Sequence, residues 1–289
     1  MLVYNVTSDK KILKEARAKA PVVIQEMFET FLGDNTVYTP KKTISREIFD
    51  VGNTYGNYNR YSGNQLIEFT RGNLLISMSN IAVIRGSTRG GGALVTVFEG
   101  MFVSVKLNNS VSDSITIESY QKKNNKAISK NPDKVLLENF EFEEIFDVYS
   151  KNQILARQIL TLEVQEQLVE FDKQTEIYKN EGFSYRNSDV AAKGTKTGKL
   201  VSFINTTDKL VDKANSRGAN STVNLKIEGQ QLTMGIRGMQ ILDNVVNPFS
   251  TVNDYISIYI SPYEKIERIM KGFEIIISNI EKMDIDNKF

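Results

Sequence analysis

Residues 36–118 restrict the fold of this chain more than any other segment, because strand-like sequences follow one another there with short turns between them. Residues 66–70 and 74–84 are rich in β-branched and aromatic side chains, and they flank Arg71-Gly72-Asn73, a turn signal typical of a β-hairpin. Strands joined by tight turns pair in antiparallel fashion. The segment therefore predicts a mostly antiparallel sheet.

A glycine run interrupts this β-rich segment and raises the question of a nucleotide site. The run Arg85-Gly86-Ser87-Thr88-Arg89-Gly90-Gly91-Gly92 has a composition that suits a phosphate-binding loop. Such a loop needs a helix directly after it, because the amides and dipole of the helix start hold the anion. Residues 93–105 are instead β-branched and aromatic. We therefore expect a hairpin connection between two strands, with Arg85 and Arg89 as candidates for contact with an anionic surface.

Helical periodicity marks an N-terminal, a central and a C-terminal segment. Residues 9–32 present one apolar face, made of Ile24, Met27, Phe28, Phe31 and Leu32. The central helix is expected to begin at Ser150, whose capping box closes with Gln153, and to run to about residue 178. Its apolar positions are Ile154, Leu155, Ile159, Leu162, Leu168 and Phe171.

The C-terminal helix is expected over residues 262–283. Ser261 and Pro262 are a helix-start pair, and the apolar residues that follow have heptad spacing. A helix packed on its own sheet fits this pattern, and a contact between two copies of the chain is the alternative.

Together these elements predict an α+β fold, with mostly antiparallel sheets packed against an N-terminal, a central and a C-terminal helix. Residues 223–227 and 232–236 add a hairpin around Glu228-Gly229-Gln230-Gln231. We expect a single domain over residues 1–289. A division into two subdomains, 1–118 and 135–289, joined by a polar, Lys-rich connection at 119–134, is left open.

The absence of cysteine and histidine excludes several function classes. Disulfides, thiolate catalysis, cysteine or histidine metal sites and the usual catalytic triads all require one of these residues. We accordingly expect no cofactor and no metal. A formal net charge of +1 gives no global attraction to nucleic acid or anionic lipid. No run approaches the ~18 apolar residues of a membrane span, and the first residues do not resemble a signal peptide. We expect a location in the cytoplasm or at the cytoplasmic face of a membrane.

An acidic cluster is the first candidate site. It consists of Glu138, Glu141, Glu143, Glu144 and Asp147, and it surrounds Phe140, Phe142 and Phe146. Paired carboxylates could serve acid–base chemistry or bind a hard cation. The alternative, which we favour, places the aromatic rings inside and the acids outside. Arg157 is then expected to form a structural ion pair with Glu138 or Glu143, giving a polar cluster of Glu138, Glu143 and Arg157.

Two loops supply the other candidates. Residues 52–64 carry Tyr55, Tyr58 and Tyr61, which either form a contact surface for a partner or fold over the edge of the sheet. The 119–134 connection carries lysines that either touch anionic lipid or acidic protein, or belong to a solvated loop. The candidate contacts there are Lys122, Lys123, Lys126, Lys130 and Lys134.

Several blocks of the sequence resemble a bacterial family called domain of unknown function 3137. The blocks are Phe98-Glu99-Gly100-Met101-Phe102, Val148-Tyr149-Ser150, Asn152-Gln153, Ala156-Arg157 and Ile159-Leu160-Thr161. The resemblance extends over about residues 24–282. It implies hydrophobic membrane spans ahead of the domain, which this sequence does not contain, and it implies no activity. Asn152 and Leu155 stand where the family has acidic residues, which argues against catalytic roles at these positions.

Three functions follow from these observations. The first is a non-enzymatic binding or scaffold protein that acts through protein contacts, at the cytoplasmic side of a bacterial membrane. The second is an enzyme that uses carboxylates or lysine without His or Cys. The third is a binder of nucleic acid or anionic lipid through Arg85, Arg89 and the 122–134 lysines. We favour the first, because no complete catalytic motif is present.

Overall fold

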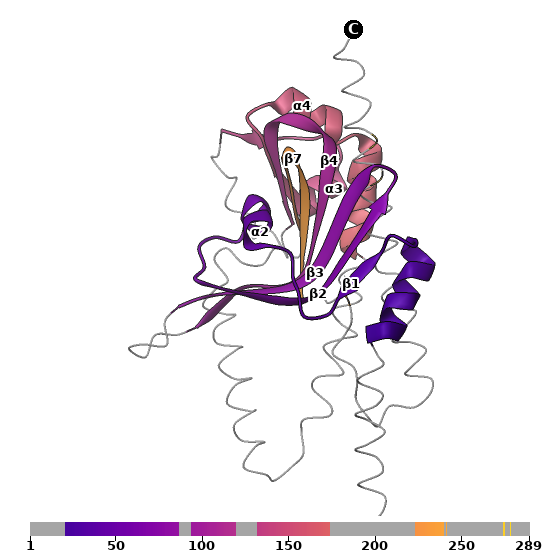
Figure 1. The fold of residues 1–289 in the computed structure, drawn as a ribbon. Helices are drawn as coiled ribbons and strands as arrows, with labels where there is room; N and C mark the ends of the chain where they lie inside the picture. The colour runs from indigo at the N-terminus through magenta and orange to yellow at the C-terminus, as the bar shows by residue number, and fades with distance from the viewer. Residues whose placement is uncertain are drawn as a thin grey trace, which may run out of the picture.

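A computed structural model describes residues 21–86, 94–119, 132–173, 223–239 and 241, with the single positions 274 and 278. The described strands form one antiparallel sheet in the order β1-β2-β3-β4-β6-β5, with β7 paired to β4 (Figure 1). The strands are β1 (Val37–Thr39), β2 (Arg60–Arg71), β3 (Leu74–Arg85), β4 (Val95–Ser119), β5 (Lys134–Val135), β6 (Phe146–Tyr149) and β7 (Val223–Arg237). The helices are α2 (Arg46–Gly52), α3 (Phe140–Ile145) and α4 (Gln153–Ile159), and residues 21–32 and 162–173 are also helical.

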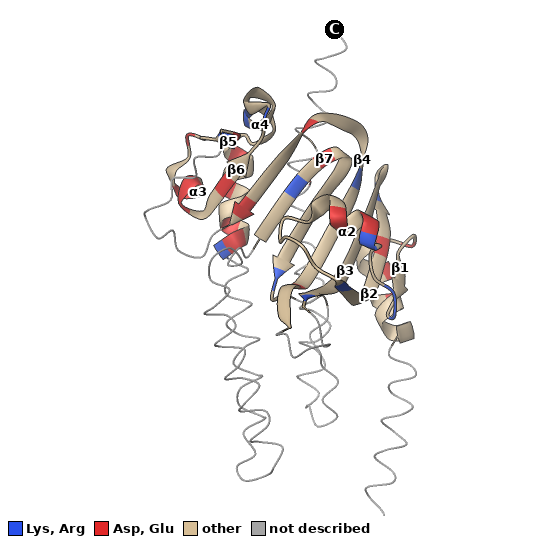
Figure 2. Ribbon diagram, turned by 90° about the vertical axis from the view of Figure 1, so that its left-hand side faces the viewer, with Lys and Arg blue, Asp and Glu red and all other residues tan. Residues whose placement is uncertain are grey.

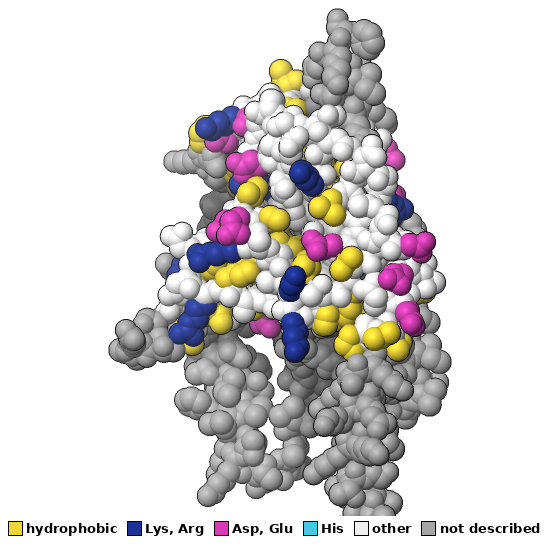
Figure 3. Space-filling model, in the orientation of Figure 1, with side chains coloured by type: hydrophobic (Ala, Val, Ile, Leu, Met, Phe, Trp, Pro, Cys, Tyr) yellow, Lys and Arg dark blue, Asp and Glu magenta, His cyan; other side chains and the backbone are white. Residues whose placement is uncertain are grey.

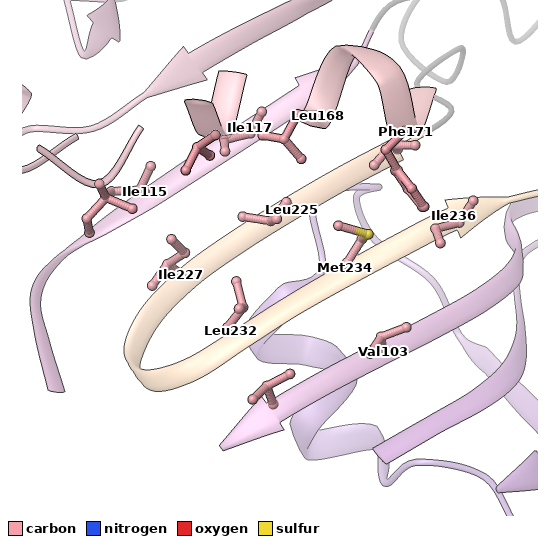
Figure 4. Packing of buried hydrophobic residues seen from close by; sticks show 14 of the residues in the cluster. Val103, Ile115, Ile117, Leu168, Phe171, Leu225, Ile227, Leu232, Met234 and Ile236 are labelled. Carbon is pink, nitrogen blue, oxygen red and sulfur yellow. The ribbon is translucent and has the colours of Figure 1, made fainter. Parts of the chain in front are cut away.

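The two longest strands, β4 and β7, each fold back on themselves, and the folded β7 lies inside the folded β4. β7 folds back at Gly229, which has a φ of 57° that residue types other than glycine rarely adopt. The Thr233 hydroxyl on one arm of β7 donates to the Lys226 carbonyl on the other arm. One arm of β7 pairs with β4 residues 100–106 and the other with β4 residues 115–118. The β7 hairpin therefore lies between the two arms of β4, and its apolar residues complete the core there (Figure 4).

The hairpins expected from sequence are confirmed. β2 and β3 pair across the turn at residues 72–73, and β3 pairs with β4 from Leu75↔Lys106 to Arg85↔Val95. Strands therefore flank the glycine run on both sides, as a hairpin connection requires. Residues 87–93 of the run lie outside the described part of the chain.

The sheet has an apolar core on each face. Alternate residues of a strand point to opposite faces, and Met101 and Phe102 accordingly belong to different clusters. The larger cluster packs the sheet against helical residues from 21–32, α3, α4 and 162–173. The smaller one joins β2, β3 and β4 to α2 and the loop after it, around the fully buried Phe49.

The central helix differs from the sequence expectation. Asn152, and not Ser150, caps α4, because its side chain accepts from Leu155 N; the Ser150 hydroxyl donates to the Asn152 carbonyl instead. α4 ends at Ile159, and the chain resumes a helix at residue 162. The N-terminal helix differs from the sequence prediction at one position, because Phe31, which is expected in the core, is 47% exposed.

The α+β class and the antiparallel sheet are confirmed. The packing of the C-terminal helix lies outside the described residues, apart from an ion pair between Arg71 and Glu274. Residues 1–118 and 135–289 contribute strands to the same sheet, and their division into subdomains stays a prediction. Within the described residues, no helix has the length and apolar character needed to cross a membrane.

Candidate binding surface

Residues 132–173 form a unit of short elements beside the second arm of β4, which we call the outer unit (Figure 2). β6 pairs with β4 residues 116–119, and β5 pairs with β6. Asn139 caps α3 by accepting from Phe142 N at 3.1 Å. The rings of Phe142 and Phe146 stack with centroids 4.8 Å apart and are fully buried. The buried apolar residues of the outer unit therefore belong to the larger cluster.

One acid of the predicted cluster lies inside this unit. Asp147, only 7% exposed, accepts from Lys134 Nζ at 2.7 Å and from the Tyr149 hydroxyl at 3.4 Å. Partial burial alone would lower the pKa of Lys134, but the hydrogen bond and the charge of Asp147 raise it above its ordinary value. Lys134 therefore stays charged near neutral pH. The expectation that all five acids point outward is wrong for Asp147.

The polar cluster of Glu138, Glu143 and Arg157 is arranged around the backbone between β5 and α3. Glu143 Oε1 accepts from Leu137 N at 3.0 Å, and Arg157 Nη2 donates to the Leu136 carbonyl at 3.2 Å. Arg157 Nη1 also lies 3.4 Å from the Gln153 carbonyl and side chain. No ion pair joins Arg157 to Glu138 or Glu143 among the described residues. Glu143 of α3 and Arg157 of α4 thus clamp the backbone of residues 136–137 onto these two helices.

Three large apolar side chains project from the clamped segment and its two helices. Leu136 is 64% exposed, Phe140 is 77% exposed and Ile154 is 70% exposed. We call these three residues the outer patch. Arg157 connects two of them, because it donates to the Leu136 carbonyl and lies one turn from Ile154 on α4. These are the three most exposed large apolar side chains of the described residues, and exposed apolar surface of this kind is a candidate interaction site.

The sequence placed these side chains wrongly. Phe140 and Ile154 were expected inside, as was Leu162, which is 59% exposed. The other predicted apolar positions of the central segment, Leu155, Ile159, Leu168 and Phe171, are buried. Phe140 and Ile154 lie in the first turns of α3 and α4, where the Asn139 and Asn152 caps are the signal in the sequence, and Leu162 is the first helical residue after Thr161.

The loop expected over residues 52–64 ends where β2 begins at Arg60, so Tyr61 lies in β2, and all three tyrosines are folded onto the sheet. The Tyr58 hydroxyl donates to Asp50 at 2.6 Å, and the Tyr61 hydroxyl donates to the Ile44 carbonyl at 2.6 Å. The Tyr55 ring lies 4.5 Å from that of Phe98, and its hydroxyl is buried against Gly235, where any side chain would overlap it. On the face that carries α2, apolar and charged side chains are interspersed in small groups (Figure 3). A role for the three tyrosines as a contact surface stays a prediction.

These tyrosines give a pH-dependent prediction. Burial, and then the hydrogen bond to Asp50, raise the pKa of Tyr58 to about 12, and burial also raises the pKa of Tyr55 and of Tyr61. Because these pKa values lie above the unfolded value near 10, their contribution to stability is complete below about pH 10 and is lost as pH rises through 12. Among the described residues, absorbance titration at 295 nm should show these three tyrosines ionising late, together with Tyr38, whose pKa burial also raises, and circular dichroism should show alkaline unfolding.

The Tyr58→Phe variant should remove one late-ionising group while leaving the ring packing in place. Titration of every tyrosine near pH 10 in the folded protein would contradict the packing described for this loop.

The remaining candidates are mostly beyond the described residues. Arg85 ends β3 and is exposed, whereas Arg89, Lys122, Lys123, Lys126 and Lys130 lie outside the described part. Contact of these residues with an anionic surface stays a prediction. In the described ranges, no group of three or more acidic residues is arranged to hold a metal ion.

The comparisons with known proteins agree with the resemblance seen in the sequence. A family model described as "Protein of unknown function (DUF3137)" matches residues 96–225, from β4 to the start of β7, which confirms the resemblance. Comparison with curated proteins gives no match. A solved structure, the crystal structure of the mycobacterial trehalose monomycolate transport factor A, TtfA, is similar over 86% of this chain and 95% of that chain, with 6% identity and a TM-score of 0.33. A likeness of this strength carries no function to this chain.

Proposed function

We propose that the protein is a binding module without chemistry of its own, which holds a partner protein on the outer patch. The observation that carries this proposal is the exposure of Leu136, Phe140 and Ile154 on a frame fixed by hydrogen bonds. Apolar and aromatic side chains of this kind supply most of the binding free energy at protein interfaces. A location at the cytoplasmic face of a membrane remains part of the proposal.

The frame supports this function because it limits the entropy lost on binding. The two helix caps, the Glu143–Leu137 hydrogen bond and the Arg157–Leu136 hydrogen bond hold the backbone beneath each apolar side chain. A surface that is already ordered loses less conformational entropy when a partner docks than a loop does.

An enzyme based on Glu138, Glu143 and Arg157 is the second candidate, and the geometry favours it less. Glu143 and Arg157 both bind backbone groups of residues 136–137, and Glu138 is exposed. A general acid or base must instead present its carboxyl group to a substrate within hydrogen-bond reach. Binding of nucleic acid or anionic lipid through Arg85 and the 122–130 lysines is the third candidate.

Affinity capture with matched variants tests the proposal. We expect the wild-type chain to retain a specific protein from a lysate of its native cell, prepared with and without detergent. The Phe140→Asp and Ile154→Asp variants should lose that protein, because a charge in the centre of an apolar contact costs about 2 kcal/mol or more, about thirtyfold in affinity. Val37→Asp, a control at a 53% exposed site on β1, should retain it. A partner retained equally by all four proteins would overturn the proposal.

A further inference from the structure

Acidic residues outnumber basic ones in the outer unit, whereas the segment directly before it carries four lysines, Lys122, Lys123, Lys126 and Lys130, outside the described part of the chain. Residues 132–173 contain ten Asp and Glu residues and four Lys and Arg residues, a formal net charge of −6. The complete chain has a formal net charge of +1. Acidic residues are visible on α3, on β6 and on the helix below them (Figure 2). Acidic side chains therefore outnumber basic ones among the described residues of the outer unit, although the protein as a whole is almost neutral.

Some of these acids have internal partners and others face solvent beside the outer patch. Asp147 pairs with Lys134, Glu141 pairs with Lys173 at 2.5 Å, and Glu143 binds the backbone. Glu138 and Glu144 are exposed, and neither forms an ion pair within the described part of the chain. Glu138 lies between Leu136 and Phe140 in the sequence, and Glu144 lies one turn after Phe140 on α3. Two uncompensated carboxylates thus flank the most exposed aromatic ring of the described residues.

We infer that the occupant of the outer patch is a basic amphipathic segment of another protein. This inference rests on the proposed function and names the chemistry of its partner. Apolar side chains on one face of such a segment cover Phe140, Ile154 and Leu136. Lysine or arginine residues beside that face lie against Glu138 and Glu144. An acidic segment, a nucleic acid or an anionic membrane would place like charge against these two carboxylates.

The apolar side chains and the exposed carboxylates contribute to binding in different ways. The apolar contacts determine how long the complex lasts, because they are desolvated on binding. The exposed carboxylates at the rim raise the association rate and select a partner of positive charge, and salt weakens their contribution.

A pair of designed peptides tests the sign of the partner's charge directly. The probes are fluorescein-labelled helices of about 18 residues, or about five turns, with the same leucine stripe and either lysine or glutamate at every other position. Fluorescence anisotropy with the full-length chain should show the lysine peptide binding at least about tenfold more tightly than the glutamate peptide in about 50 mM salt. Raising the salt to about 500 mM should remove most of this difference.

Charge-reversal variants test whether the preference for the lysine peptide arises from Glu138 and Glu144. The Glu138→Lys, Glu144→Lys double variant should lower affinity for the lysine peptide about tenfold and raise affinity for the glutamate peptide. The control, with Asp34→Lys and Glu99→Lys at exposed sites away from the outer unit, changes the net charge equally and should leave both affinities within about twofold. Circular dichroism checks that each variant is folded.

The outcomes separate this inference from the proposed function. If both peptides bind equally, or if the two double variants behave alike, the basic partner is ruled out; the proposed function survives provided that Phe140→Asp still weakens binding. If Phe140→Asp and Ile154→Asp change neither peptide binding nor the captured partner, the outer patch is not the docking site and both proposals fail.

Discussion

Replacing Asp147 with alanine should destabilise the protein by about 3 kcal/mol, because it leaves the Lys134 ammonium group mostly buried without its counter-charge. The side chains of Lys134 and Asp147 are only 15% and 10% exposed. An ion pair in this position is difficult to break on one side, since the remaining charge cannot be fully rehydrated without opening the contact between β5 and β6. Thermal unfolding followed by circular dichroism should show Tm lowered by roughly 6 to 12 °C.

Two further variants separate the buried pair from charge effects in general. Glu141→Ala removes an ion pair of similar geometry whose side chains are 52% and 58% exposed, and it should cost less than about 0.5 kcal/mol. The Lys134→Met, Asp147→Leu double variant removes both charges, and it should recover most of the stability lost in Asp147→Ala. Equal losses in Asp147→Ala and Glu141→Ala would show that the Asp147 carboxylate is not held in the interior.

The sequence predicted the hairpins of this fold because their signals are local. A glycine at the turn and β-branched residues on both sides are enough to specify β2–β3 and the folded β7. The insertion of β7 between the arms of β4 joins residues more than a hundred positions apart, such as Met101 and Ile236. Nothing in either segment specifies the other, apart from their common apolar alternation, so the nested arrangement was not predictable from the sequence.

Helical periodicity predicts the wrong position for Ile154, and the aromatic-inside pattern predicts the wrong position for Phe140, because the elements that carry them are short. α3 has six residues and α4 has seven, and each begins at an Asn cap. In a helix of two turns, only a few positions reach the core, and a first-turn residue such as Phe140 or Ile154 has no preceding turn to fix which face it shares. The predicted long helix placed Ile154 in the core, whereas the caps place it outside.

Asp147 was misplaced for a different reason. An acid between Phe146 and Val148 on a strand should point away from their core face, and it does, but the other face is also covered there. Its cover includes Lys134, a residue 13 positions earlier that the sequence grouped with a solvated loop. Only the pairing of β5 with β6 brings the two charges together.

Gly100→Val should be the other strongly destabilising substitution, with a loss of about 3 kcal/mol or more. Gly100 lies in β4 between β3 and β7, opposite Ile81 and Arg237. A Cβ at this position would overlap the carbonyl oxygen of Ile236, and that obstacle is backbone, which cannot rotate away as a side chain can. The β4–β7 contact would have to open, and this contact holds the β7 hairpin in the sheet. The glycine of the Phe98–Phe102 block therefore has a structural cause in the close approach of two strands.

The neighbouring residue supplies a matched control for this position. Glu99→Val introduces the same side chain one residue earlier, on an exposed site of β4, and should change the free energy of unfolding by less than about 0.5 kcal/mol. Gly100→Ala should already be destabilising, because the overlap begins at Cβ. Urea unfolding of the three variants should therefore rank Glu99→Val as most stable, then Gly100→Ala, then Gly100→Val. A Gly100→Val protein with the unfolding midpoint of Glu99→Val would mean that β7 does not pass this closely along β4, and the nested arrangement of the two strands would have to be abandoned.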